Sequence, residues 1–216
     1  MALTRVNAST AISGTIAASS VANATVANIS SLPASIPTGA LTLLSTQTAS
    51  SSASISFTSG IDSTYDSYVF KFINIHPQTD AAGFQFNMSI DGGSNYNVTK
   101  TTTAFLAYHN EADNSTGLTY LTDYDLAQST AFQPMAYTTG NDADQNTSGT
   151  LQIFNPASSV YVKHFISNFC EYTYNDHSQN DFVTGYANTT SPVNAFRFQM
   201  SSGNIDDGII KMYGVK

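Results

Sequence analysis

The sequence contains few charged residues for its length. Lys and Arg number 7 and Asp and Glu number 15 among 216 residues, so the formal net charge is −8 and only 10% of the residues are charged. A protein that follows nucleic-acid phosphates needs clustered Lys or Arg side chains, and no such cluster occurs in this sequence. We therefore expect no nucleic-acid partner, and a surface covered mainly by Ser, Thr, Asn and Gln.

Cysteine and long apolar runs are scarce as well. Cys170 is the only cysteine, so no disulfide can form within the chain, and the disulfide scaffolds of small secreted proteins are excluded. We interpret Cys170 as a small buried residue rather than as a thiol nucleophile. No run approaches the ~20 apolar residues of a membrane-spanning helix, and the N-terminus lacks the apolar core of a signal peptide. We expect no membrane partner.

Residues 1–40 differ in composition from the rest of the chain. They contain one charged residue, Arg5, no aromatic residue, and much Ala, Ser and Thr, and they end near Pro33 and Pro37. Such a segment buries too little apolar surface by itself to offset its ordering entropy. We interpret it as an extended N-terminal anchoring arm of a β-sandwich domain formed by residues 41–216; packing of the segment on its own domain is the alternative. The residues expected to contact another subunit are Ile12, Ile16, Val21, Val26, Ile29 and Leu32.

The stretch Phe84–Val98 predicts two β-strands joined at a tight turn. Apolar and polar residues alternate before the turn, as in a strand with one buried face. If the two strands pair with each other, Ile90 faces Tyr96 and Met88 faces Val98, because opposed residues share a face. This register places Gly93 at the centre of the loop, where a residue with positive φ is needed.

From residue 41 onward, short strands alternate with turn residues, and no stretch has the periodicity of a helix. Ser67–His76 is apolar on both faces, with Tyr68, Phe70 and Phe72 on one of them, and Val160–Phe169 shows the same pattern. A strand with two apolar faces is covered on both sides. We expect the arm or neighbouring subunits to provide the second cover. The pattern predicts an all-β, jelly-roll-like antiparallel β-sandwich preceded by an extended N-terminal arm.

Few residues suggest catalysis. The four histidines are widely spread, and no G-x-S-x-G nucleophile motif occurs. Two close carboxylate pairs, Asp123 with Asp125 and Glu111 with Asp113, have the residue types of a glycosidase, but polar loops carry such pairs routinely. We assign no catalytic residue and no cofactor, and we interpret the chain as a non-enzymatic protein.

One loop has the residue types of a calcium site. Asp142, Asp144 and Asn146 form a D-x-D-x-N run of oxygen ligands, which Ca²⁺ prefers. The run departs from the EF-hand loop at Thr147, where that loop has glycine, and at Ile153, where it has glutamate. A solvated polar loop is the favoured interpretation, and calcium is the alternative.

Tyrosine is the residue most suited to binding. The chain has 12 Tyr and no Trp, and Tyr172 and Tyr174 lie on one face of the segment CEYTYND. Two such rings can stack on a sugar or anchor a protein contact. Packing within the sandwich or between subunits is the competing interpretation.

Three segments together resemble a family of β-sandwich domains found in virion proteins of tailed bacteriophages, often in tail fibres or other surface components. They are FTSGIDSTYDSYVFKFINIHPQTD, FQFNMSIDGGSNY and FRFQMSSGNIDDGIIKMYGVK. His76 is inserted in the corner of the first segment, which is a small departure from the pattern. The matching features are Tyr65, Tyr68, Asn74, Pro77, Asp91–Ser94, Ser202–Asn204 and Gly208–Gly214, within roughly residues 50–216.

The resemblance implies a structural virion protein on the surface of a phage particle, as a tail-fibre or capsid-decoration component in contact with other virion proteins. It implies no catalytic residue. We expect a homotrimer, because virion appendages commonly close around a threefold axis. The alternative function is a receptor-binding module that contacts a host surface glycan through Tyr172 and Tyr174.

Overall fold

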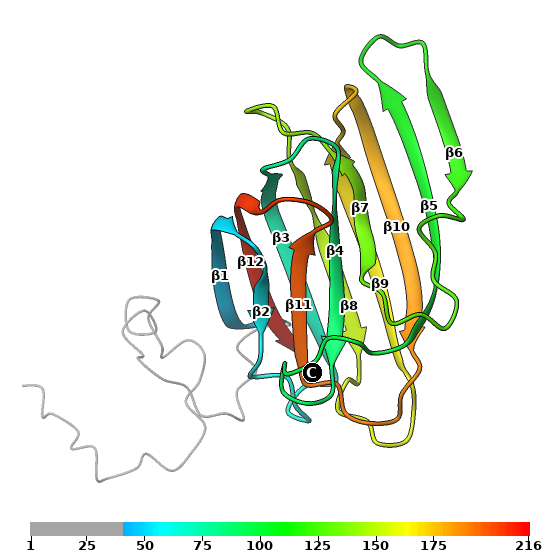
Figure 1. Cartoon of the computed structure of the whole chain (residues 1–216). Coiled ribbons are helices and arrows are strands. Elements are labelled where there is room, and N and C mark those ends of the chain that lie inside the picture. The colour runs from blue at the N-terminus through cyan, green and yellow to red at the C-terminus, as the bar shows by residue number, and fades with distance from the viewer. Residues whose placement is uncertain (1–40) are drawn as a thin grey trace, which may run out of the picture. The chain divides into compact units, whose positions relative to one another are not determined.

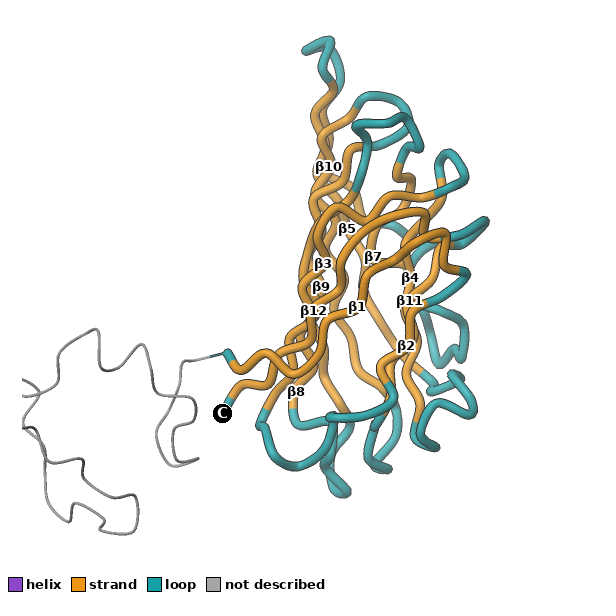
Figure 2. Tube along the Cα trace, turned by 90° about the vertical axis from the view of Figure 1, so that its left-hand side faces the viewer, coloured by secondary structure: helices purple, strands orange, loops and turns teal. Residues whose placement is uncertain are grey.

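The computed structural model describes residues 41–216, and these form two packed antiparallel sheets without a helix. The eight-stranded sheet has the order β1-β12-β3-β8-β9-β10-β5-β6, and the four-stranded sheet has the order β2-β11-β4-β7 (Figures 1 and 2). The strands are β1 (Thr42–Ser52), β2 (Ile55–Phe57), β3 (Ser67–Pro77), β4 (Ala82–Ser89), β5 (Lys100–Asn110), β6 (Thr116–Tyr120), β7 (Gln133–Thr139), β8 (Thr147–Phe154), β9 (Lys163–Tyr172), β10 (His177–Ala187), β11 (Ala195–Met200) and β12 (Ile205–Val215).

The strand order is that of a jelly roll with two inserted hairpins. Without β5–β6 and β9–β10, the sheets reduce to β1-β12-β3-β8 facing β2-β11-β4-β7, which is the eight-strand winding of a jelly roll. Both hairpins join the same sheet beside β8. Figure 1 shows β5 and β6 at the margin of the fold, and β6 is exposed along most of its length. The all-β jelly-roll prediction is confirmed.

Phenylalanines from both facing sheets lie together in the core. Phe84, Phe86 and Met88 of β4 are fully buried, as their alternation predicts. Phe72 of β3 lies 5.0 Å from Phe198 of β11 and 5.4 Å from Phe84 between ring centroids, in edge-to-face geometry. Such pairs add about 0.5–1.5 kcal/mol each to the burial of the rings. The phenylalanines therefore hold the two sheets in a fixed register.

The predicted hairpin of Phe84–Val98 is wrong in its pairing. β4 ends at Ser89 and pairs with β11 and β7, while residues 95–99 form no strand. Ile90 is 44% exposed and does not lie opposite Tyr96 in a ladder. Alternation identifies the buried face of β4, but both edges of β4 are occupied by strands from distant parts of the chain. The chain after the turn therefore crosses to the eight-stranded sheet as β5.

The turn requires glycine, as the sequence predicts. Gly92 and Gly93 have φ values of 71° and 90°, which L side chains rarely adopt. Asp91 Oδ1 accepts hydrogen bonds from Ser89 Oγ at 2.6 Å and from the Asn95 backbone N–H at 2.9 Å. A Cβ at Gly93 would lie 2.6 Å from the hydroxyl oxygen of Tyr96. The glycines thus shape a crossing between the sheets instead of a hairpin.

The strand predicted over Val160–Phe169 begins later than expected. β9 starts at Lys163, and Val160 and Tyr161 lie in the preceding loop with exposed fractions of 66% and 71%. Phe165 and Phe169 face the core, whereas Ile166 on the outer face is half exposed. The inner face of β3 is buried as predicted through Tyr68, Phe70 and Phe72. Cover of the outer face by other subunits stays a prediction.

Candidate functional site

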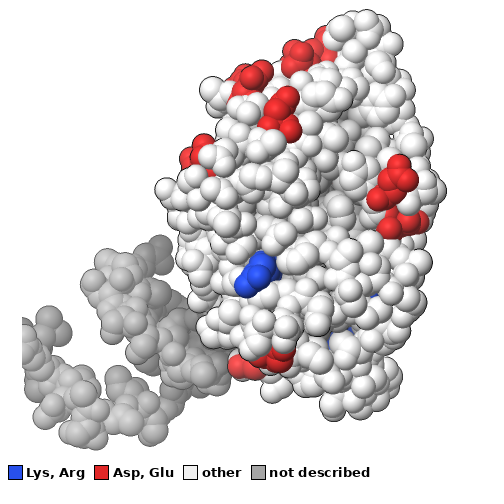
Figure 3. All heavy atoms as spheres, viewed as in Figure 1, with Lys and Arg blue, Asp and Glu red and all other residues white. Residues whose placement is uncertain are grey.

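The acidic residues concentrate at one end of the sandwich. Thr42 pairs with Gly214, so the sandwich begins and ends at the same end, which we call the proximal end. The opposite, distal end holds the loops β3–β4, β5–β6, β7–β8, β9–β10 and β11–β12. Figure 3 shows acidic side chains along the upper, distal part of one face, with no basic group beside them. The distal acids are Asp80, Glu111, Asp113, Asp142, Asp144, Asp176, Asp206 and Asp207, and no described Lys or Arg lies in these loops.

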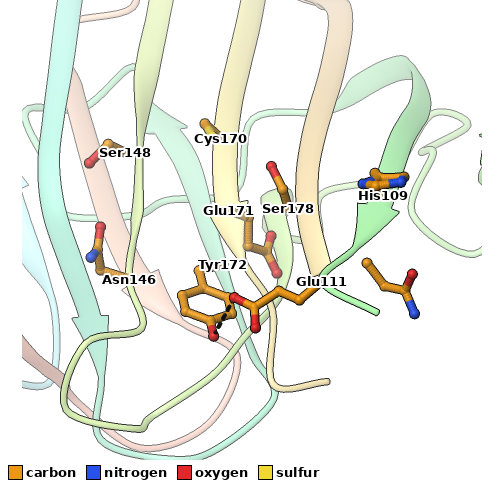
Figure 4. Close-up of a pocket in the computed structure, with 9 residues that line it drawn as sticks. His109, Glu111, Asn146, Ser148, Cys170, Glu171, Tyr172 and Ser178 are labelled. Carbon is orange, nitrogen blue, oxygen red and sulfur yellow. Dashed lines mark hydrogen bonds between the residues drawn. The ribbon is translucent and has the colours of Figure 1, made fainter. Parts of the chain in front are cut away.

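A hollow of about 490 Å³ opens on the outer face of the eight-stranded sheet next to the distal end. Three small side chains form its floor, Ser148 on β8, Cys170 on β9 and Ser178 on β10. Ser148 is opposite Cys170 in the ladder, and Ser178 is opposite Tyr172. Because small side chains stand on three adjacent strands, the sheet surface is recessed there. The larger side chains of His109, Glu111, Asn146 and Tyr172 surround the floor (Figure 4).

Hydrogen bonds fix the rim of the hollow. The Tyr172 hydroxyl donates to Glu111 Oε1 at 3.1 Å and to Asp176 Oδ1 at 3.4 Å. The backbone N–H of Glu111 donates to the carbonyl oxygen of Asp176 at 3.1 Å, which joins the β5–β6 and β9–β10 loops. The hydrogen bond to Glu111, with partial desolvation and nearby carboxylates, raises the pKa of Tyr172 to about 12. The phenol therefore stays neutral and serves as a hydrogen-bond donor at physiological pH.

A second hollow adjoins the first on the other side of Glu111. It has a volume of about 440 Å³ and is lined by Asn110, Glu111, Ala112, Asn175 and Asp176. Asn110 and Glu111 line both hollows. The Glu111–Asp176 contact is thus a wall between two neighbouring recesses, and the distal end offers an extended polar surface.

Two buried carboxyl groups lie beneath this surface, between the sheets. Glu171 accepts hydrogen bonds from the backbone N–H groups of Tyr137 at 2.7 Å and Thr138 at 2.6 Å, which ties β9 to β7 of the opposite sheet. Asp181 Oδ1 accepts a hydrogen bond from Gln179 Nε2 at 2.8 Å. Asp181 Oδ2 is buried and has no hydrogen-bond partner among the described residues.

Both carboxyl groups have pKa values above their usual range, and that of Asp181 is raised more strongly. Burial and the charge of Glu171 raise the pKa of Asp181 well above its usual range. Burial also raises the pKa of Glu171, but two backbone N–H donors oppose the shift. Because those donors favour an ionised Glu171, Asp181 is the group that keeps its proton to higher pH.

Two buried lysines lie near the opposite end of the same strands. Lys100 on β5 and Lys163 on β9 both pair with Ala187 of β10 and are fully buried. Lys163 Nζ donates to the carbonyl oxygens of Ser158, Tyr161 and Thr189 at 2.7–3.1 Å. Desolvation lowers the pKa of Lys100 to about 7. These lysines join proximal loops to the sheet, and neither is available to the distal surface.

The two tyrosines predicted to contact a receptor occupy different positions. Tyr172 lines the hollow. Tyr174 lies in the β9–β10 loop, is 49% exposed, and donates its backbone N–H to the carbonyl oxygen of Thr138 at 3.1 Å. The structure therefore brings Tyr172, and not Tyr174, together with His109 and Glu111.

The D-x-D-x-N loop is organised by a buried glutamine. Gln145 Oε1 accepts from the backbone N–H of Asp142 at 3.1 Å, and its Nε2 donates to the carbonyl oxygen of Thr173 at 3.1 Å. Asn146 Nδ2 donates to the backbone carbonyl of Asp144 at 3.3 Å, and its side chain lines the hollow. Within residues 41–216, no group of three or more His, Cys, Asp or Glu residues is placed to hold a metal ion. The calcium alternative gains no support from this arrangement.

The remaining expectations concern Cys170, the N-terminal arm and a membrane-spanning helix. Cys170 is exposed in the hollow, so its predicted burial is wrong: its side chain points away from the core, which Phe169 and Glu171 face. The arm residues Ile12, Ile16, Val21, Val26, Ile29 and Leu32 lie outside the described residues. In the part of the chain that the structure describes, no helix is long and apolar enough to cross a membrane.

Sequence reasoning missed the carboxyl pair, although a signal was present. Glu171 has the same parity along its strand as Phe165 and Phe169, both of which face the core. A carboxylate in phase with core aromatics indicates a buried charge that needs partners. Its partners, on β7 and β10, come from other parts of the chain and could not be read from the local pattern.

In comparisons with known proteins, the chain matches no family model, no curated protein and no solved structure. The function is therefore argued from the residues and their arrangement.

Proposed function

We propose that this chain is a structural virion protein of a tailed bacteriophage, displayed on the particle surface as a tail-fibre or capsid-decoration component. The observation that carries the proposal is the polarity of the sandwich. Residue 41 follows the proposed arm directly, and β1 begins at the end where β12 finishes. Attachment through residues 1–40 would leave the distal loops and the hollow directed away from the particle. The resemblance of residues 50–216 to phage surface domains supports the same role.

The outer face of the eight-stranded sheet supports association with further copies. Apart from Asp206 and Asp207 at the start of β12, the strands of this sheet carry two acids, and both point into the core. Several large apolar side chains are exposed on this sheet, at fractions of 37–74%: Leu43, Ile73, Phe105, Leu118, Tyr120, Phe154 and Ile166. Such a face favours burial between subunits, and a homotrimer is the state that we propose.

Truncation tests the anchoring role. Residues 39–216 form a compact unit of their own, and the buried hydrophobic residues of the described part, 41–216, form one core cluster. A chain lacking residues 1–40 should therefore fold, with the far-UV spectrum and the melting temperature of the sandwich, but should not enter particles. Normal incorporation of the folded, truncated chain would contradict the proposal. Light scattering counts the subunits of the full chain, and a stable monomer would contradict the trimer.

A second role, contact with a host surface glycan, is favoured by the position of Tyr172 in a hollow next to the distal end, beside Glu111 and His109. The aromatic ring, the carboxylate of Glu111 and the imidazole of His109 are side chains of the kind that contact sugars. We propose neither a catalytic step nor a nucleic-acid or membrane partner for the chain. Glycan binding and association with further copies are compatible, because the hollow lies next to the distal end, whereas the exposed side chains of Leu43, Phe154 and Ile166 lie toward the proximal end of the same sheet.

A further inference from the structure

The polar groups of the hollow point to its ligand class. We infer that the hollow binds an uncharged, hydroxyl-rich ligand the size of a monosaccharide, namely a neutral sugar unit of a surface glycan. The inference rests on the second role proposed above and adds the position of the site and the charge of the ligand. A volume of about 490 Å³ falls within the roughly 300–1,000 Å³ of small-molecule sites.

Hydrogen-bonding groups remain available around the floor. Glu111 uses Oε1 to accept from Tyr172, and its Oε2 accepts no hydrogen bond from the described residues. Asn146 uses its Nδ2 group, and its Oδ1 is free of partners among residues 41–216. The Ser178 hydroxyl likewise has no partner in the described structure and faces the hollow. Three acceptors around a recessed floor suit the donor hydroxyls of a sugar ring.

Other side chains around the hollow are already held in place, so binding would order few of them. His109 Nε2 is hydrogen-bonded to Asp113 Oδ1 at 3.0 Å, and Tyr172 is hydrogen-bonded to Glu111 and Asp176. Ser148 accepts a hydrogen bond from the backbone N–H of Asn74 at 3.0 Å. Preorganised side chains lower the entropic cost of binding a small ligand.

The charge of the distal end selects against anionic sugars. Eight carboxylates lie at this end without a described Lys or Arg in its loops, and the carboxyl group of Glu171 lies below the hollow. Glu111 itself stands on the rim. A ligand carboxylate or phosphate placed there would face like charges with no cation to pair with it, which is unfavourable. A neutral hydroxyl donates to the same carboxylates.

Titration of the full chain with matched sugars tests the inference by nuclear magnetic resonance. The probes are the methyl glycosides of glucose, galactose, mannose and N-acetylglucosamine, and methyl glucuronide, which has the ring of glucose with a carboxylate. At millimolar concentration, at least one neutral glycoside should shift the amide signals of Cys170, Tyr172 and Ser178. Methyl glucuronide should bind at least about tenfold more weakly than that glycoside. Absence of shifts with every neutral probe, or equal binding of the glucuronide, would overturn the inference.

Variants locate the site and its charge. Ser178→Leu fills the floor and should weaken binding about tenfold or more, whereas Thr150→Leu places the same side chain on the same face outside the hollow and should leave binding unchanged. Glu111→Gln removes one negative charge from the rim and should narrow the difference in affinity between methyl glucoside and methyl glucuronide. Equal affinities of the two Leu variants would refute the position of the site. An unchanged difference in affinity in Glu111→Gln would refute the claim that the rim charge selects against anionic sugars. The titration uses the isolated chain, so its failure is distinguishable from failed incorporation into particles.

Discussion

Replacing Asp181 with Asn should change how the stability of the protein depends on pH. In the folded chain, Asp181 keeps its proton to higher pH than in the unfolded chain, because burial and the charge of Glu171 raise its pKa. In the unfolded chain both carboxyl groups ionise near about pH 4. Above that pH the folded state binds about one more proton than the unfolded state. The contribution of the pair to stability is therefore complete below about pH 4 and is lost as the pH rises toward the folded pKa.

The size of the effect follows from proton linkage. One extra proton in the folded state lowers the free energy of unfolding by about 1.4 kcal/mol per pH unit. Between about pH 5 and pH 7 the wild-type chain should lose roughly 2–3 kcal/mol from this source, as long as Asp181 keeps its proton in the folded chain. An amide at position 181 cannot ionise and keeps an oxygen to accept from Gln179. Asp181→Asn should therefore gain about that amount relative to wild type over the same interval.

Guanidinium unfolding at a series of pH values measures the difference, followed by circular dichroism or by tyrosine fluorescence, since the chain has no Trp. Wild type and variant share every other side chain, so the remaining contributions to the pH dependence cancel in the difference. Glu171→Gln is the matched control. Its amide NH₂ group would face one of the two backbone N–H groups, of Tyr137 and Thr138, that donate to Glu171 in the wild type. It should destabilise the protein by about 1–3 kcal/mol at every pH. Parallel stability curves for wild type and Asp181→Asn would refute the raised pKa of Asp181.

Three further outcomes follow from individual contacts. Gly93→Val should lower the melting temperature by more than about 4 °C relative to Ser94→Val. The reason is that the φ of residue 93 is 90° and that its new Cβ would lie 2.6 Å from the Tyr96 hydroxyl oxygen. Equal melting temperatures of the two variants would contradict the turn geometry. Hydrogen bonds from Ser89 and Asn95 lower the pKa of Asp91 to about 2, so the stabilisation that Asp91 provides is present above about pH 4 and is lost as the pH falls toward 2. In Asp91→Asn the free energy of unfolding should therefore depend less on pH in that range. An unchanged pH dependence would count against these hydrogen bonds. Lys163→Met leaves three carbonyl acceptors without their donor, and it should lower the free energy of unfolding measured in guanidinium by about 2–5 kcal/mol. A decrease below about 0.5 kcal/mol would contradict this, because it would show that water replaces the ammonium group.

Alternation in the sequence predicted the core well, because it reports which side of a strand is buried. Phe84, Phe86 and Met88 are buried together with Phe196 and Phe198, as their spacing indicates. Alternation does not report which strand lies alongside. β4 pairs with β11, which lies more than a hundred residues away in the chain, and the local hairpin expected after β4 does not form.

The candidate site was harder to predict for the same reason. Tyr172 was singled out by residue type, but the hollow beside it exists because Ser148, Cys170 and Ser178 are brought together by the register of three strands. Cys170 was expected to be buried because cysteine usually is, and the parity of β9 overrides that tendency. The buried lysines and carboxyls depend on partners in distant loops, which a local pattern does not identify.

Imaging of intact particles by electron cryomicroscopy tests the central proposal most directly. The account predicts jelly-roll density on the particle surface in groups of three, with the end where β1 begins directed toward the particle and the β5–β6 and β9–β10 loops directed outward. Purified particles that lack the chain, or that bury the loops carrying Glu111 and Asp176 against the particle, would contradict it.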